Sequence, residues 1–74
     1  MADDPGLDVA RACARLFATP DGRLLLDHLR RAHLDRALGP DASDALLRHR
    51  EGQRALVLTL ESLAARGRAA GTEA

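Results

Sequence analysis

Thr19-Pro20-Asp21-Gly22 is the stretch of sequence that decides the fold. Pro20 disfavours the α conformation at Thr19, so a preceding helix has to end there. Thr19 then suits the N-cap of a second helix, and Pro20 suits its first position, where the missing N–H costs nothing. Asp21 complements the positive end of the new helix. The tetrapeptide therefore predicts a sharp corner between two helices.

A second break falls at Gly39-Pro40, because Gly accepts the conformation that ends a helix and Pro cannot continue one. Asp41 or Ser43 is expected to cap the helix that follows. Gly67 is expected to end that helix as its C-cap residue. We therefore predict three helices, at about residues 7–18, 20–38 and 42–66.

Length and composition favour one all-helical domain. The chain has 74 residues, of which 46% are apolar, so it can form one thin core and is not disordered. Leu and Ala dominate, and β-branched residues are few. The predicted fold class is all-α, a three-helix small domain with a long C-terminal helix. We expect a flexible N-terminus, a single helical domain and a frayed C-terminal tail at residues 1–6, 7–67 and 68–74.

Apolar residues recur at helical spacing and predict one buried stripe on each helix. The predicted core consists of Val9, Cys13, Leu16, Phe17, Leu25, Leu29, Leu56, Val57, Leu60 and Leu63. Four further leucines do not fit these inward faces, namely Leu34, Leu38, Leu47 and Leu58. Either the helices pack loosely across one another, or this surplus surface meets another chain. Both interpretations stay open at this point.

The charge pattern disfavours nucleic acid as a partner. Eleven basic and eleven acidic side chains give a formal net charge of zero, and every basic residue is Arg. A neutral domain lacks the positive field on which non-specific nucleic-acid binding depends. The exclusive use of Arg has two explanations, a GC-rich codon bias or a selection for bidentate pairing with carboxylate or phosphate.

The chain offers little for catalysis or for a cofactor. His28 and His33 are five residues apart, about 140° around a helix, so they do not converge on one ion. His49 adds no third ligand at a suitable spacing, and Cys13 has no second thiol to pair with. Neither a Gly-x-Ser-x-Gly elbow nor a glycine-rich phosphate loop is present. We predict a protein that is not an enzyme, with no catalytic residues, no metal and no cofactor.

The first residues carry no signal peptide, and no apolar run approaches the ~20 residues of a membrane span. The sequence therefore predicts a cytoplasmic bacterial protein without a membrane partner.

The segment from Arg48 to Arg54 is the best candidate for a binding site. Gly52 costs about 1 kcal/mol inside a helix, so its presence there predicts a closely crossing helix or a kink. The arginines form either a solvated cluster or a contact patch for an acidic surface or a phosphate. The candidate partner-binding residues are Arg50, Glu51, Arg54, Leu47 and Leu58.

Two segments carry a family resemblance. Phe17-Ala18-Thr19-Pro20-Asp21-Gly22, followed by residues 24–29 (Leu-Leu-Leu-Asp-His-Leu), resembles the N-terminal half of small proteins encoded by tailed phages and prophages. The segment 50–58, Arg-Glu-Gly-Gln-Arg-Ala-Leu-Val-Leu, is similar to the segment that closes the same family. That family was first described in a Bordetella phage, and related small genes lie among the head genes of prophages and gene-transfer-agent clusters. The resemblance covers about two-thirds of the chain.

The resemblance implies a role in virion assembly and supplies no catalytic residues. It predicts an accessory protein that binds a capsid, portal or connector protein in the cytoplasm. It leaves open a homo-oligomer and incorporation into a phage-like particle. One alternative is a helix-turn-helix or small-terminase-like DNA-binding module, in which the segment 20–38 would be the recognition helix. A third is a stand-alone bacterial regulator that dimerises through exposed leucines.

Overall fold

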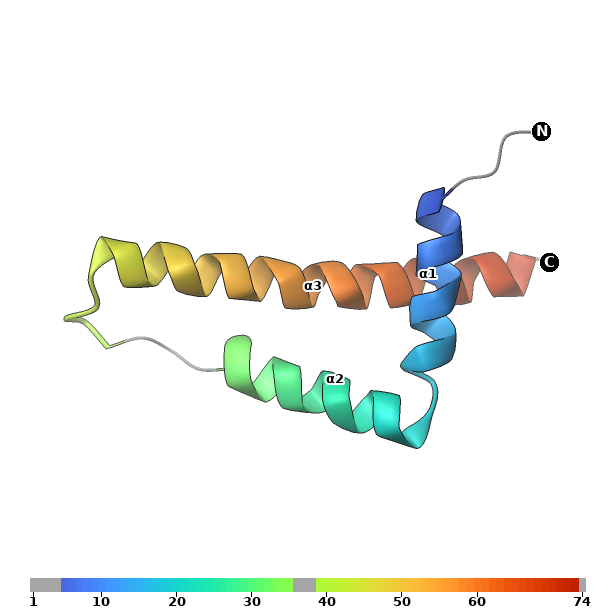
Figure 1. Cartoon of the computed structure of the whole chain (residues 1–74), viewed down its shortest axis with the longest axis horizontal. Helices are drawn as coiled ribbons and strands as arrows, with labels where there is room; N and C mark the ends of the chain where they lie inside the picture. Colours follow the sequence, from blue (N-terminus) through green and yellow to red (C-terminus); the bar gives the residue numbers. More distant parts are fainter. Residues whose placement is uncertain (1–4, 36–38, 74) are drawn as a thin grey trace.

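The computed structural model describes residues 5–35 and 39–73, and within them it contains three helices and no strand. The helices are α1 (Pro5–Leu16), α2 (Pro20–His33) and α3 (Asp44–Glu73). In Figure 1, α1 crosses α3 steeply near the C-terminal end of α3, and α2 lies alongside the middle of α3. The contact of α1 with α3 is much more extensive than that of α2. The predicted all-α fold with a long C-terminal helix is confirmed.

The corner between α1 and α2 follows the sequence prediction. Thr19 has an extended conformation, and its Oγ1 accepts a hydrogen bond of 2.9 Å from the Gly22 N–H. The same hydroxyl donates to the Leu16 carbonyl oxygen at 2.7 Å, so it joins the end of α1 to the start of α2. A Cβ on Gly22 would lie 2.7 Å from the Leu16 carbonyl carbon, which explains why this position has no side chain. Thr19 therefore caps α2 and links it to the end of α1.

The second break was predicted in the right region, but α2 ends at His33 and not near Leu38. Leu34 and Asp35 both donate their backbone N–H groups to the Arg30 carbonyl oxygen, at 2.7 and 3.1 Å. Two donors on one carbonyl tighten the last turn and end the regular α pattern. Residues 36–38, which the sequence assigned to this helix, lie outside the described residues. After the break, Ser43 caps α3, since its Oγ accepts from the Leu46 N–H at 3.1 Å.

Gly67 does not end α3, so that prediction is wrong. The helix continues through residues 68–73, and Gly67 is buried inside it. A Cβ at Gly67 would lie 2.6 Å from the Ala10 carbonyl carbon and 2.9 Å from the Ala14 Cβ. Gly67 is thus the point of closest approach between α1 and α3. The close approach predicted for Gly52 is also wrong, because nothing lies within 4 Å of a Cβ built there.

The core is small and sits mainly where α1 crosses α3. Ala10, Phe17, Val57 and Ala64 are the buried apolar residues of the described chain. The predictions for Phe17 and Val57 are confirmed, whereas Cys13, Leu29, Leu60 and Leu63 are half-buried. Four predicted core residues are exposed, namely Val9 (51%), Leu16 (54%), Leu25 (49%) and Leu56 (62%). These four predictions are wrong. Leu56 is exposed because α1 crosses α3 nearer its C-terminal end, and Val9, Leu16 and Leu25 are on sides of α1 and α2 that no other helix of the described chain covers.

Candidate functional site

Arg50 and Arg54, two of the five candidate binding residues, contact the C-terminal end of α2. The Arg54 Nη1 donates to the Leu34 carbonyl oxygen at 2.8 Å. The Arg50 Nη1 donates to the Ala32 carbonyl oxygen at 3.4 Å. The last carbonyls of a helix lack intrahelical donors and carry a partial negative charge, so a guanidinium there stabilises the helix end. The two arginines therefore fasten α2 to α3 and help to stop α2 near Leu34.

Glu51 lies beside Arg54, as the i,i+3 spacing predicts. The Arg54 Nε is 3.7 Å from the Glu51 Oε1, and the Glu51 side chain is 76% exposed. A pair with this exposure contributes little stability. Glu51 is consequently more accessible to another molecule than Arg54.

Leu47 and Leu58 share the outer side of α3. They are 44% and 47% exposed. Eleven residues separate them, which places them within about 20° of each other around the helix, and Glu51 lies within about 40° of both. Leu58 is nine residues before Gly67 and so projects about 180° away from the side that α1 covers. We call Leu47, Glu51 and Leu58 the outer stripe of α3.

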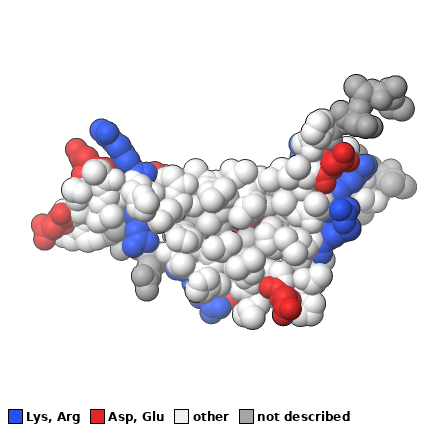
Figure 2. Space-filling model, viewed as in Figure 1, with Lys and Arg blue, Asp and Glu red and all other residues white. Residues whose placement is uncertain are grey.

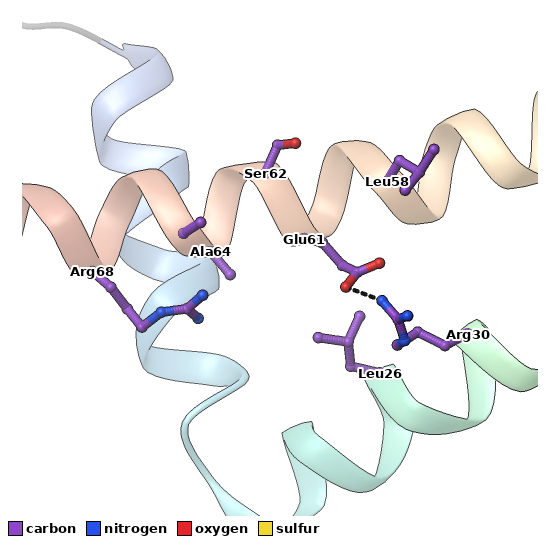
Figure 3. A pocket seen from close by; sticks show the side chains of 8 residues that line it. Leu26, Arg30, Leu58, Glu61, Ser62, Ala64 and Arg68 are labelled. Atoms are coloured by element: carbon purple, nitrogen blue, oxygen red, sulfur yellow. Dashed lines mark hydrogen bonds and ion pairs between the residues drawn. The ribbon is translucent and has the colours of Figure 1, made fainter. Parts of the chain in front are cut away.

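A pocket of about 390 Å³ lies between α2 and α3 beside Leu58. Figure 3 shows Leu26 and Arg30 reaching it from α2, while Leu58, Glu61 and Arg68 belong to α3. Arg30 and Glu61 form an ion pair across it. The complete lining is Leu26, Arg30, Leu58, Glu61, Ser62, Ala64, Ala65 and Arg68. Four of these eight residues are apolar and four are polar or charged, so the pocket offers an apolar wall to a partner's side chain and polar groups around it.

Sequence reasoning found Leu58 but missed Leu26, Arg30 and Glu61. Arg30 and Glu61 are 31 residues apart and face each other only because α2 folds back on α3. The spacing of residues within one helix cannot predict an ion pair between two helices. The signal that could have found it is the opposite charge of two residues on facing stripes, once an antiparallel arrangement is assumed.

The histidines do not converge. His49 lies against Gln53, with 3.1 Å between the two Nε2 atoms. Across residues 5–35 and 39–73, no three His, Cys, Asp or Glu side chains are grouped so that they could hold a metal ion. No helix in this part of the chain has the length and apolar content to cross a membrane.

Comparison with known protein families gave a match. The family model described as Bbp19-like phage protein matches residues 13–71, which include the end of α1, all of α2 and nearly all of α3. The comparisons with curated proteins and with solved structures gave no match. The matched range contains the Thr19 corner, the outer stripe and the pocket. Because the match extends over most of the sequence, the chain belongs to the family of Bbp19-like phage proteins.

Proposed function

We propose that the protein is a non-enzymatic accessory protein of phage particle assembly, which binds a capsid, portal or connector protein through the outer stripe of α3. Membership of a phage protein family supports the setting. The observation that carries the proposal is the exposure of Leu47 and Leu58 on one side of α3, with the pocket beside Leu58. Bbp19-like phage proteins are not a known enzyme family, which favours a binding role. The protein acts in the bacterial cytoplasm, where such particles assemble.

The chemistry of the surface fits a protein partner. Interface hot spots combine a pocket that takes an apolar anchor with a rim of polar groups. Here the pocket between Leu26 and Leu58 would receive the anchor, and Glu51 and Arg68 would form part of the rim. Arg54 is less suitable as the anchor point, because its guanidinium already holds the end of α2.

A DNA-binding role is less well supported by the charges. Three of the eleven arginines form ion pairs with carboxylates of the described residues, namely Arg30 with Glu61, Arg31 with Asp27 and Arg54 with Glu51. Phosphate contacts need cations that are not already neutralised, and the net charge of the chain is zero. Binding to DNA in place of a protein would therefore contradict this proposal.

The test is co-purification of the tagged chain with the capsid, portal and connector proteins encoded with it, expressed together. We expect one of them to copurify, and we expect Leu58→Glu to abolish the complex. The matched control is Leu24→Glu, because Leu24 is 65% exposed on α2 and does not line this pocket. Unchanged binding by Leu58→Glu would contradict the proposed surface. Recovery of double-stranded DNA with a steep salt dependence, and no protein, would support the DNA-binding alternative.

A further inference from the structure

The molecule has a large apolar face that the proposed function does not use. Five of its large apolar side chains are 42–62% exposed on the side of α3 that α1 crosses. We call this set the open face, and it consists of Val9, Leu16, Leu25, Leu46 and Leu56. Four of the five are residues for which helical spacing predicts burial. The helical spacing of these apolar residues thus indicates a buried face, but no described part of the single chain covers it.

Helix geometry places these side chains on one side of the molecule. Leu56 is eleven residues before Gly67 and projects within about 20° of it, so it points to the α1 side of α3 but several turns before the crossing. Leu46 lies about 60° from Gly67 by the same arithmetic. On α1, Val9 and Leu16 are seven residues apart and about 20° from each other. Leu25 projects about 140° from Arg30, which points toward the pocket on the opposite face.

The open face carries almost no charge. From Ala45 to Leu63, the residues that project within about 60° of Gly67 on α3 carry no Asp, Glu or Arg. They are Ala45, Leu46, His49, Gly52, Gln53, Leu56, Leu60 and Leu63. Figure 2 shows this face of the molecule, with charged side chains gathered at its two ends and its lower edge. The middle of the view is white, over α3 and the adjoining part of α2. Such a surface is suited to a partner that is itself apolar.

The chain exposes more surface than a compact monomer of its mass. The molecule measures 51 × 29 × 15 Å, and a second layer of helix is present only where α1 crosses α3, whereas stable domains pack two layers around a core. Its accessible surface is 5609 Å². A compact monomer of 7.9 kDa exposes about 4400 Å². The excess of about 1200 Å² exceeds the ~800 Å² per partner that a stable interface buries.

We propose that the open face binds a second copy of this chain, so that the protein is a homodimer with the two α3 helices packed face to face. A two-fold dimer joins the same patch on both subunits, and a self-complementary apolar face meets this condition. The zero net charge removes the general repulsion between copies. The second copy supplies the missing second layer and completes the core that four buried residues cannot provide. The outer stripe stays free on both protomers for the partner of the proposed function.

The test compares two leucines that lie two residues apart on opposite sides of α3. Leu56 belongs to the open face, Leu58 to the outer stripe, and both are exposed in the single chain. We expect the wild-type chain to sediment as a dimer, with a melting temperature that rises with protein concentration. Leu56→Glu should weaken the dimer at least ~100-fold, because symmetry puts the substituted residue into the interface twice. Leu58→Glu should leave the dimer intact.

Leu46→Glu provides a second substitution on the open face, and circular dichroism reports whether each variant keeps its helices. Loss of helix in both variants, with a concentration-dependent wild-type melting temperature, would indicate that the dimer is required for folding and would support the proposal. A wild-type chain that is monomeric at every concentration would overturn it. So would dissociation by Leu58→Glu and not by Leu56→Glu. Loss of the assembly partner on Leu56→Glu, with a monomeric wild type, would assign the open face to that partner.

Discussion

The contact of α3 with α1 and its contact with α2 are made by different kinds of residue. Where α1 crosses α3, Gly67 lies against Ala10 and Ala14, so the two backbones come close together, and Ala64 is buried one turn before Gly67. Where α2 meets α3, long charged side chains bridge a wider gap, with Arg30 on Glu61 and Arg54 on the Leu34 carbonyl. The first contact is steric, and the second is electrostatic.

This difference affects how each contact tolerates change. Close-packed interiors respond to a single added methyl group, because there is no free volume to accept it. The contact between α2 and α3 is loosely packed. A pocket lies beside Leu58, and two buried atoms, His33 Nδ1 and Glu61 Oε1, have no hydrogen-bond partner in the described chain. We therefore expect α1 and α3 to form the rigid part of the molecule, and α2 to be the adjustable part.

Truncation of Phe17 should have the largest effect on the crossing. Phe17 is 8% exposed and anchors the end of α1 at the corner. Phe17→Ala should lower the free energy of unfolding by roughly 3 to 5 kcal/mol, enough to unfold a domain this small. Thermal melting followed by circular dichroism measures this. Leu24→Ala, at a residue 65% exposed, serves as the control and should change little. Similar melting of both variants would show that Phe17 is not part of the stabilising core.

A methyl group at the crossing should have the next largest effect. Gly67→Ala places a Cβ against the Ala10 carbonyl, which belongs to backbone and cannot rotate away. We expect a loss of roughly 1 to 3 kcal/mol in the free energy of unfolding, despite the better helix propensity of Ala. Gly71→Ala, one turn later with nothing within 4 Å, is the matched control and should be neutral or stabilising. Denaturant unfolding of the two variants compares them, and equal stabilities would exclude the close crossing.

The parts of the fold that sequence could predict are those that local chemistry determines. The Thr19 cap, Pro20 at the first position of α2 and the Ser43 cap each depend on contacts within three residues. The number of helices and the helical stripes follow from periodicity in the same way.

The parts that could not be predicted depend on a second helix. Gly67 preceded by Arg66 has the pattern of a helix end, and only the position of Ala10 on α1 shows that this glycine admits a crossing. Arg50 and Arg54 have the sequence pattern of a surface patch. Their hydrogen bonds to carbonyl oxygens at the end of α2 become visible only in the folded structure. Burial of Leu56 was predicted from a stripe whose covering partner the chain itself does not provide.

Removal of the guanidinium at residue 54 tests the electrostatic contact. Arg54→Met keeps most of the apolar stem but removes the donor to the Leu34 carbonyl. We expect a loss of about 1 to 2 kcal/mol, the range for a hydrogen bond to a charged group that is partly exposed. Amide hydrogen exchange should accelerate in the last turn of α2 and not in α1. Equal acceleration in both helices would mean that the two contacts are not separable.

The smallest expected effect has the opposite sign and concerns Gly52, on the same helix as Gly67. Gly52 is exposed, has a φ in the ordinary negative range and would present a Cβ to open space. Ala at such a position restricts the unfolded chain and favours the helix, so Gly52→Ala should stabilise by about 0.4 to 1 kcal/mol. Gly52→Ala should therefore raise the melting temperature and Gly67→Ala should lower it. The two signs differ because another helix lies against Gly67 and none of the described chain lies against Gly52. A destabilised Gly52→Ala would show that something covers this position in solution. Repeating the melt with Leu56→Glu in the background would then decide whether the covering molecule is a second copy of the chain, since only a contact made by the dimer should disappear with the dimer.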